Sequence, residues 1–474
     1  MINNNTICAI STAAGVGGIA IIRVSGNDAI EICDKIFRGR KKLSETESNR
    51  VVFGEIVATV ETRRASSLQQ PQQQTIDEVL ITVFRAPHSF TGENTVEISC
   101  HGSIYIQQKI VELLLAAGAQ LAQAGEFTRR AFRNGKFDLS QAEAIADLIA
   151  SSSKAAHRVA MNQMRGGFTQ KLAELRNKLL NFVTLIELEL DFSEEDVEFA
   201  NRSTLYELIQ KIDTNIAKLT DSFQLGNAIK TGIPVAIIGE TNVGKSTLLN
   251  LLLNEEKAIV SDIHGTTRDV IEDTININGV VFRFIDTAGI RDTADTIESL
   301  GIERTFQKIE QASIVLWLID LTTPITQIET LATSIIPKLE NKHTILVFNK
   351  ADLFSDKEIT LKQNILPQIQ AERLFISAKN QQNMEQLQHL LVKVAEIPII
   401  GENDVIVTNL RHYEALKNAL EAIRRVKEGL EMGIASDFVS QDIRECMFYL
   451  GEIVGEISSD EVLGNVFEKF CIGK

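Results

Sequence analysis

The segment that most constrains the fold runs from Ile233 to Leu253, where an apolar run of strand length precedes a glycine-bounded loop and a leucine-rich stretch. The loop fits the pattern G-x-x-x-x-G-K-[ST], with Gly239 and Gly244 as its glycines and Lys245-Ser246 at its end. Backbone N–H groups of such a loop point at phosphate oxygens, and the next helix directs its positive dipole end at the same anion. We expect Lys245 to reach the β- and γ-phosphates and the Ser246 hydroxyl to bind Mg²⁺. A glycine-rich turn without chemistry is the alternative, but the flanking strand and helix favour a phosphate-binding domain.

Length and composition indicate a multidomain globular protein. At 474 residues the chain is too long for one hydrophobic core, and its length predicts roughly three domains. The content of 44% apolar and 23% charged residues is typical of soluble proteins, and no apolar run approaches the roughly twenty residues of a membrane span. The five cysteines are scattered singly, and the N-terminus lacks the basic start and apolar core of a signal peptide. We therefore expect a cytoplasmic protein without a disulfide framework, a zinc site or membrane contact.

The charge distribution limits the kinds of partner. The net charge of −15 argues against a general nucleic-acid coat, because a phosphate backbone requires a basic surface. Basic residues nevertheless gather between Arg129 and Lys136, so local contact with a nucleic acid is compatible with the sequence.

Residues 1–135 predict a mixed α/β fold. Expected strands cover residues 6–10, 18–24, 51–60, 77–84 and 95–99, and expected helices cover residues 27–37 and 103–117. The loop from Gly15 to Gly18 lacks the G-x-G-x-x-G spacing and the following helix of a dinucleotide site, so we reject that interpretation. The glutamine-rich residues 61–75 predict a low-complexity surface loop.

The rest of the chain predicts helices on both sides of an α/β segment. Helical spacing of apolar residues marks residues 172–190, 410–430 and 438–454. Further strands of the α/β segment are expected at 280–285, after an Asn278-Gly279 hairpin turn, and at 313–319, 344–348 and 374–376. One helical domain that carries an inserted α/β domain is the simplest explanation, and two separate helical domains are the alternative. The expected domain bounds are 1–136, 137–231 with 398–474, and 232–397.

Four further motifs follow the phosphate loop in the order that a guanine-nucleotide switch requires. Residues 265–269 hold a threonine hydroxyl, Thr267, that can complete the Mg²⁺ shell, and the motif at 286–289 places Asp286 near the metal. The motif at 349–352 offers the Asp352 carboxylate to the N1–H and exocyclic amine of guanine, which adenine cannot match, and residues 377–379 can supply a backbone N–H to the guanine oxygen. Together the motifs predict a GTP-binding domain. The expected GTP contacts are Asn242, Val243, Gly244, Lys245, Ser246, Thr247, Thr266, Thr267, Asp286, Thr287, Ala288, Gly289, Asn349, Lys350, Asp352, Ser377, Ala378 and Lys379.

The residues expected to support hydrolysis are less ordinary. Many such GTPases have a glutamine directly after the Asp-Thr-Ala-Gly motif to orient the attacking water, but Ile290 stands here and can neither donate nor accept a hydrogen bond. The acidic residues 291–298 offer candidates, although a solvated loop without chemistry is the better interpretation of their composition. Asn242 could offer its side-chain carbonyl to a monovalent cation in place of an arginine finger, although asparagine in a loop is more often a turn former.

At this point the residues resemble one family closely, the tRNA-modifying MnmE (TrmE) family of TrmE-Era-EngA-like GTPases. Four signatures carry the resemblance over the whole chain: Gly17–Gly26, Ser89–Glu97 with His101-Gly102, Gly125–Lys136, and the terminal Phe470–Lys474. The resemblance implies a multidomain α/β plus α fold. It would comprise an N-terminal α+β folate-binding domain that also dimerises, a helical domain, and an inserted Ras-like P-loop α/β GTPase domain.

The resemblance also implies a folate site and a potassium site. The folate, 5-formyl-tetrahydrofolate or methylene-tetrahydrofolate, would be bound by Arg23, Glu97, Lys136 and Lys474. Cys471 is a candidate reactive thiol beside the one-carbon unit, or only lines the pocket. K⁺ would be bound by Asn242, Ser261, Ile263 and Thr266, with Ser261 also beside the GTP, and would promote face-to-face dimerisation of the GTPase domains. Glu298 would orient the attacking water. The family often has threonine where Ser261 stands, and serine or the backbone can still make that contact.

Two functions fit these features. In the first, a homodimer of this GTPase assembles with the flavin-dependent partner MnmG as a heterotetramer or larger complex. That complex would add an aminomethyl or carboxymethylaminomethyl group to C5 of wobble uridine 34 in tRNA. In the second, the chain is a non-catalytic ribosome-assembly switch, which predicts an RNA-binding appendage and no folate site. The terminal signature Phe470–Lys474 and the N-terminal signatures favour the first.

Overall fold

The computed structural model describes residues 5–60, 72–191, 202–256, 273–285, 306–362, 364–395, 401, 404–434, 436–456, 460–468, 470 and 473. The chain forms two compact units. The first contains the chain up to Ala146 and the segment from Leu450 onward, and the second contains most of the chain between them.

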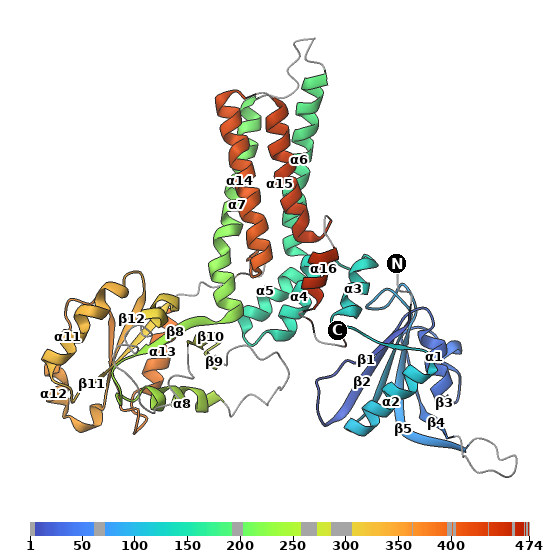
Figure 1. The fold of residues 1–474 in the computed structure, drawn as a ribbon, viewed down its shortest axis with the longest axis horizontal. Helices are drawn as coiled ribbons and strands as arrows, with labels where there is room; N and C mark the ends of the chain where they lie inside the picture. The colour runs from blue at the N-terminus through green and yellow to red at the C-terminus, as the bar shows by residue number, and fades with distance from the viewer. Residues whose placement is uncertain are drawn as a thin grey trace. The chain divides into compact units, whose positions relative to one another are not determined.

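The first unit is built on a mixed sheet of strand order β3-β4-β5-β6-β2-β1-β7 (Figure 1). Its strands are β1 (Ile7–Ile10), β2 (Gly17–Ser25), β3 (Phe37–Gly39), β4 (Arg50–Val60), β5 (Gln72–Phe84), β6 (Thr95–Gly102) and β7 (Gln120–Leu121). Helices α1 (Ala29–Ile36) and α2 (Ile104–Ala117) pack on one face of the sheet, where alternate residues of β2 (Ala20, Ile22 and Val24) are buried. This alternation leaves Arg23, between two buried neighbours, on the opposite face.

One prediction is wrong at residues 72–75, which we expected to lie in a low-complexity surface loop. They belong to β5, where Gln72 pairs with Val60 and Thr75 pairs with Val57. A polar side chain does not prevent the backbone from forming ladder hydrogen bonds, and Gln73, Gln74 and Thr75 are exposed to solvent. Glutamine content therefore indicated the exposed surface correctly and the backbone conformation wrongly.

The C-terminal end of the chain packs against helices of the first unit. Helix α16 (Asp460–Phe467) lies against α3 (Glu126–Arg133) and the start of α4 (Leu139–Ala150), in a core that includes Leu139, Phe467 and Phe470. Gly125, at the start of α3, has φ +62°, and an added Cβ would stand 2.6 Å from the carbonyl oxygen of Phe467. Glycine is thus required there by both the backbone conformation and the close approach of α16.

In the second unit, helices from both sides of the α/β segment pack together. They are α5 (Lys154–Met164), α6 (Gly167–Asp191) and α7 (Arg202–Thr231) before it, and α14 (Leu410–Met432) and α15 (Ser436–Val454) after it. Helix α7 lies along α14 (Figure 1), with the rings of Phe223 and Tyr413 stacked at 4.5 Å between centroids. The hydroxyl of Tyr206 donates to Glu431 Oε1 at 2.6 Å. Helix α7, before the α/β segment, therefore packs against α14, after it.

The α/β segment is a doubly wound sheet of order β13-β12-β11-β8-β10-β9. Its strands are β8 (Ile233–Ile238), β9 (Asp273–Ile277), β10 (Val280–Phe284), β11 (Ile314–Asp320), β12 (His343–Asn349) and β13 (Glu372–Phe375). All pairs are parallel except the β9–β10 hairpin, whose turn at Asn278-Gly279 was predicted. Helices α8 (Lys245–Glu256) and α13 (Met384–Val394) contribute to the core on one face, and α11 (Ile325–Ile335) contributes to that on the other. Helix α12 (Asp356–Lys362) follows β12.

Candidate functional site

The phosphate loop connects β8 to α8, and two close contacts explain its glycines. Gly239 has φ +147°, and a Cβ there would stand 2.3 Å from the carbonyl oxygen of Leu318. Gly244 has φ +103°, and a Cβ there would stand 2.4 Å from Asn349 Nδ2. Asn242 also has a positive φ, +61°, a conformation that asparagine tolerates better than most residues. The loop therefore needs glycine at positions 239 and 244, and its place between β8 and α8 is that of a phosphate-binding loop.

Lys245 is the positively charged residue of this loop. Its ammonium donates to the carbonyl oxygens of Gly239 at 2.8 Å and Glu240 at 2.6 Å. Burial and the nearby Lys308 lower the pKa of Lys245, and Glu240 partly opposes them. A phosphate bound in the loop would favour the charged ammonium, because an opposite charge at short range offsets the cost of burial. Ser246 follows directly at the start of α8, so its hydroxyl adjoins the same anion site.

Asn349 connects three of the predicted motifs. Its side chain is buried, with Nδ2 donating to the carbonyl oxygen of Val243 at 2.7 Å and Oδ1 accepting from the N–H of Ala378 at 2.9 Å. The phosphate loop, the 349–352 motif and the 377–379 motif are therefore held together by one amide. Asp352 lies exposed nearby in sequence, where its carboxylate is accessible to a base.

Asp320 was not among the predicted residues; it ends β11 directly opposite Asn349 on β12. Its Oδ2 pairs with Lys350 Nζ at 2.5 Å, and its Oδ1 accepts from the N–H and hydroxyl of Thr322. Burial alone would raise the pKa of Asp320, but the hydrogen bonds from Lys350 and Thr322 outweigh it and lower the pKa. Lys350 is also in the left-handed conformation, φ +66°, so this ion pair helps to hold a disfavoured backbone state. The signal available in the sequence was an aspartate at the end of a strand that neighbours the 349–352 motif.

Several predicted residues lie outside the described residues. They are Ser261, Ile263, Thr266, Thr267, Asp286, Thr287, Ala288, Gly289, Ile290, Glu298, Cys471 and Lys474. Of the predicted Mg²⁺ and K⁺ ligands, the structure therefore describes Ser246 and Asn242. Both lie on the phosphate loop or at its helix, where oxygen ligands suit hard cations.

In the first unit, Arg23 and Glu97 form an ion pair on the sheet face opposite α1 and α2. The two residues are cross-strand neighbours on β2 and β6, and Arg23 Nε donates to Glu97 Oε1 at 3.0 Å. The Arg23 guanidinium lies 5.4 Å from the ring centroid of Phe90 and 5.6 Å from that of Phe127. Both charged side chains remain partly accessible, 21% and 25% exposed. A cation and a carboxylate beside aromatic rings are suited to a flat polar ligand that carries an acidic group.

Lys136 belongs to the same part of the first unit, because its ammonium donates to the carbonyl oxygen of Pro87 at 3.0 Å. Pro87 and Phe90 lie in the loop between β5 and β6. Phe90 and Phe127 were not predicted as site residues, although Phe90 lies within the signature Ser89–Glu97 and Phe127 within Gly125–Lys136.

The four described cysteines are unsuited to thiolate chemistry. Cys8, Cys33, Cys100 and Cys446 are buried and unbonded to one another. Burial raises the pKa of Cys8 and Cys100 to about 11 and that of Cys446 to about 12, so these groups are thiols near neutral pH. Across the described helices, none is long and apolar enough to cross a membrane.

Comparisons with known proteins cover the chain from end to end. The family described as "MnmE helical domain" matches residues 139–471, and the family described as "GTP-binding protein TrmE N-terminus" matches residues 6–136. A protein named tRNA modification GTPase MnmE from Bacteroides thetaiotaomicron is 58% identical over 478 residues, covering 100% of both chains. Proteins of the same name from Parabacteroides distasonis and Flavobacterium johnsoniae are 58% and 50% identical. The alignments cover 99% and 100% of this chain, respectively, and 100% of each relative.

Proposed function

The chain belongs to the MnmE family of tRNA modification GTPases, and from that premise we propose that it is a K⁺-activated GTPase that modifies wobble uridine 34 of tRNA in the cytoplasm. Together with a flavin-dependent partner, it would use the one-carbon unit of a folate to add an aminomethyl or carboxymethylaminomethyl group at C5 of the uridine. The observation that carries the GTPase part is the Asn349 amide, which links the phosphate loop to both base-recognition motifs.

The residues that would bind GTP have separate roles. Gly239 and Gly244 let the loop pack closely against the Leu318 carbonyl oxygen and the Asn349 amide, and Lys245 would supply a positive charge to the developing negative charge on the γ-phosphate. Asn349 holds the loops in register, and Asp352 would accept from the guanine edge. These residues bind and orient the nucleotide and select its base.

Metal ions would complete the site for hydrolysis. Ser246 and Thr267 would hold Mg²⁺, which neutralises charge on the β- and γ-phosphate oxygens when bound. Asn242, Ser261, Ile263 and Thr266 would hold K⁺, and Glu298 would orient the attacking water. Because Ile290 cannot orient water, a residue other than the one directly after the Asp-Thr-Ala-Gly motif must do so.

The folate site would be formed by Arg23, Glu97, Lys136 and Lys474, with Cys471 near the one-carbon unit. Support comes from the Arg23–Glu97 ion pair beside Phe90 and from the Lys136 ammonium on the adjoining loop. Arg23 and the lysines would bind the acidic tail of the folate, and Glu97 would accept from the N–H edge of its pterin ring. The protein would act as a homodimer and assemble with MnmG and tRNA.

Two variants separate the nucleotide and folate sites. Thermal unfolding of the parent chain with 5-formyl-tetrahydrofolate should show a higher Tm, because a ligand that binds the native state stabilises it. Arg23→Met should weaken folate binding by more than about tenfold, since a charged hydrogen bond is lost, and should leave GTP binding unchanged. Lys245→Ala should weaken GTP binding and leave folate binding unchanged. A parent chain that binds GTP normally but is not stabilised by 5-formyl-tetrahydrofolate would contradict the folate part of the proposal.

A further inference from the structure

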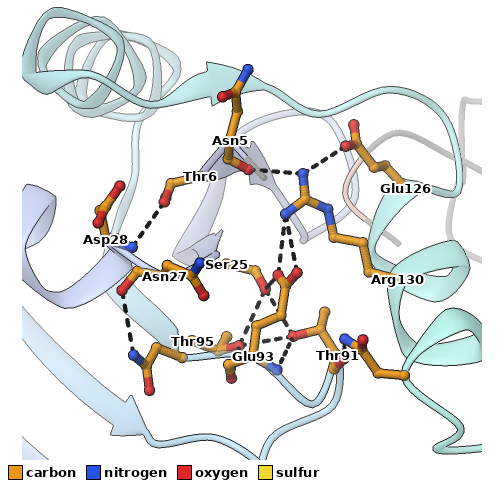
Figure 2. Close-up of polar contacts among 12 residues, drawn as sticks. Asn5, Thr6, Ser25, Asn27, Asp28, Thr91, Glu93, Thr95, Glu126 and Arg130 are labelled. Atoms are coloured by element: carbon orange, nitrogen blue, oxygen red, sulfur yellow. Dashed lines mark hydrogen bonds and ion pairs between the residues drawn. The ribbon is translucent and has the colours of Figure 1, made fainter. Parts of the chain in front are cut away.

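A buried arginine links several segments of the first unit in a hydrogen-bond network (Figure 2). Arg130, on α3, is 9% exposed. Its guanidinium donates to Glu93 Oε1 at 3.3 Å and Oε2 at 3.1 Å, to Glu126 Oε1 at 2.9 Å, and to the carbonyl oxygen of Asn5 at 2.9 Å. Figure 2 shows these bonds leaving the guanidinium in two directions, toward the Glu93 carboxylate and toward Asn5 and Glu126.

Glu93 extends the network to the end of β2. Its Oε2 accepts from the Ser25 hydroxyl at 2.8 Å, and the Ser25 and Thr91 hydroxyls lie 2.8 Å apart. Ser25 and Thr91 are fully buried. Ser25 follows Arg23 by two positions on β2, so the same carboxylate joins this strand to the loop between β5 and β6.

The charges of this network explain why its members depend on one another. One guanidinium lies between two carboxylates, with the Glu93 side chain 23% and the Glu126 side chain 11% exposed. A buried carboxylate is costly unless it is paired and hydrogen-bonded, and removal of one partner from such a set leaves the others uncompensated. The planar fork of arginine serves three acceptors at once, which the compact ammonium of lysine cannot do with the same geometry.

The network joins the two elements that carry the aromatic rings near Arg23. Phe90 lies three residues before Glu93 in the loop, and Phe127 lies on the helix that carries Arg130. A second contact joins the same loop and helix end, because Asn134 Nδ2 donates to the carbonyl oxygen of Thr91 at 2.7 Å. Loss of the Arg130–Glu93 bond would remove the ion pair that joins the loop to α3 and leave the Asn134 contact at the end of the helix, so Phe90 would be held less firmly beside Arg23.

We propose that Arg130 is a positioning residue for the folate site, which it organises by fixing the β5–β6 loop and helix α3 around Arg23. The inference rests on the proposed function, since it assigns a further residue to that same site. Arg130 acts through Glu93 and through the two elements that carry Phe90 and Phe127, and its own side chain is buried. Its guanidinium forms ion pairs with the carboxylates of Glu93 and Glu126.

The test compares dissociation constants for 5-formyl-tetrahydrofolate and for a guanine nucleotide in the full chain. Arg130→Lys and Glu93→Gln should each weaken folate binding by at least about tenfold, because a charged hydrogen bond that positions the site is lost. Both should bind the guanine nucleotide as the parent does. Arg129→Lys, at the half-buried neighbour on the same helix, is the matched control and should bind folate normally.

A second control separates positioning from stability. Asp34 accepts from the backbone N–H groups of Leu43 at 2.6 Å and Ser44 at 3.0 Å, beside the covered face of the same sheet. Asp34→Asn should lower the Tm of the chain and leave the folate affinity unchanged. If Arg130→Lys does not fold, Glu93→Gln decides the question.

The outcomes distinguish the two proposals. A parent chain that binds 5-formyl-tetrahydrofolate, together with Arg130→Lys and Glu93→Gln variants of parental affinity, overturns the positioning role alone. The positioning role is also overturned if Arg130→Lys and Glu93→Gln lose no more affinity for 5-formyl-tetrahydrofolate than Asp34→Asn does. A parent chain that does not bind 5-formyl-tetrahydrofolate overturns the folate site and this inference with it.

Discussion

Replacement of Asn349 by alanine should remove two buried hydrogen bonds that hold the loops of the nucleotide site together. The Asn349 amide is 4% exposed and bonds the Val243 carbonyl at 2.7 Å and the Ala378 N–H at 2.9 Å. Alanine would leave both backbone groups without this partner in a site closed to solvent. Each such group costs about 1–3 kcal/mol, so the change should cost roughly 2–6 kcal/mol.

The nucleotide should bind more weakly because this cost falls on the loops that it contacts. If only about 2 kcal/mol of the cost is expressed in binding, the dissociation constant rises about thirtyfold. Titration of the full chain with a fluorescent guanine nucleotide measures this change directly. The matched control is Asn380→Ala, because Asn380 is exposed and its backbone N–H, which donates to Ser377 Oγ at 3.2 Å, survives the substitution.

A parental dissociation constant for Asn349→Ala would refute this reasoning. It would mean that the phosphate loop and the 377–379 motif keep their positions without the amide. An equal loss in Asn380→Ala would also refute it, because the effect would then belong to the loop surface rather than to the buried hydrogen bonds.

Four further predictions concern the nucleotide site and the terminal cysteine. Lys245→Ala should abolish binding of a fluorescent guanine nucleotide, since it removes the ammonium that lies within the phosphate loop and would bind the phosphates; retained affinity would contradict this role. Glu298→Ala should bind GTP normally and hydrolyse it more slowly in K⁺, and a parental rate of phosphate release would show that another group orients the water. GTP hydrolysis by the parent should be faster in K⁺ than in Na⁺, and Asn242→Ala should lose that difference; equal parental rates in the two salts would remove the cation site. Cys471→Ser should abolish wobble-uridine modification if the thiol reacts and preserve it if the thiol only lines the pocket, which nucleoside analysis of tRNA would decide.

Local pattern predicted much of the fold, because each element carries its own hydrophobic period. The buried run Ile314–Ile319 and the alternating residues of β2 indicated the two sheets, and the Asn278-Gly279 pair indicated its hairpin turn. The glutamines at 72–74 led to the wrong prediction of a loop, since strand pairing by the backbone continues where side chains are polar.

Contacts between distant segments could not be predicted in this way. Arg130 and Glu93 are 37 positions apart, and Asp320 meets Lys350 only because β11 and β12 are paired in register. Motif matching found the residues expected to touch ligands, such as Lys245 and Asn349. It did not find the side chains that hold those residues in place, because such partners are set by tertiary packing rather than by spacing along the chain.

The central claim is that this chain is required for modification of the wobble uridine, and nucleoside analysis of tRNA tests it most directly. Bulk tRNA from cells that lack the chain should lose the aminomethyl or carboxymethylaminomethyl group at C5 of uridine 34. The parent chain should restore it, whereas Lys245→Ala and Arg23→Met should fail to do so. An unchanged level of the modified nucleoside in cells without the chain would contradict the claim.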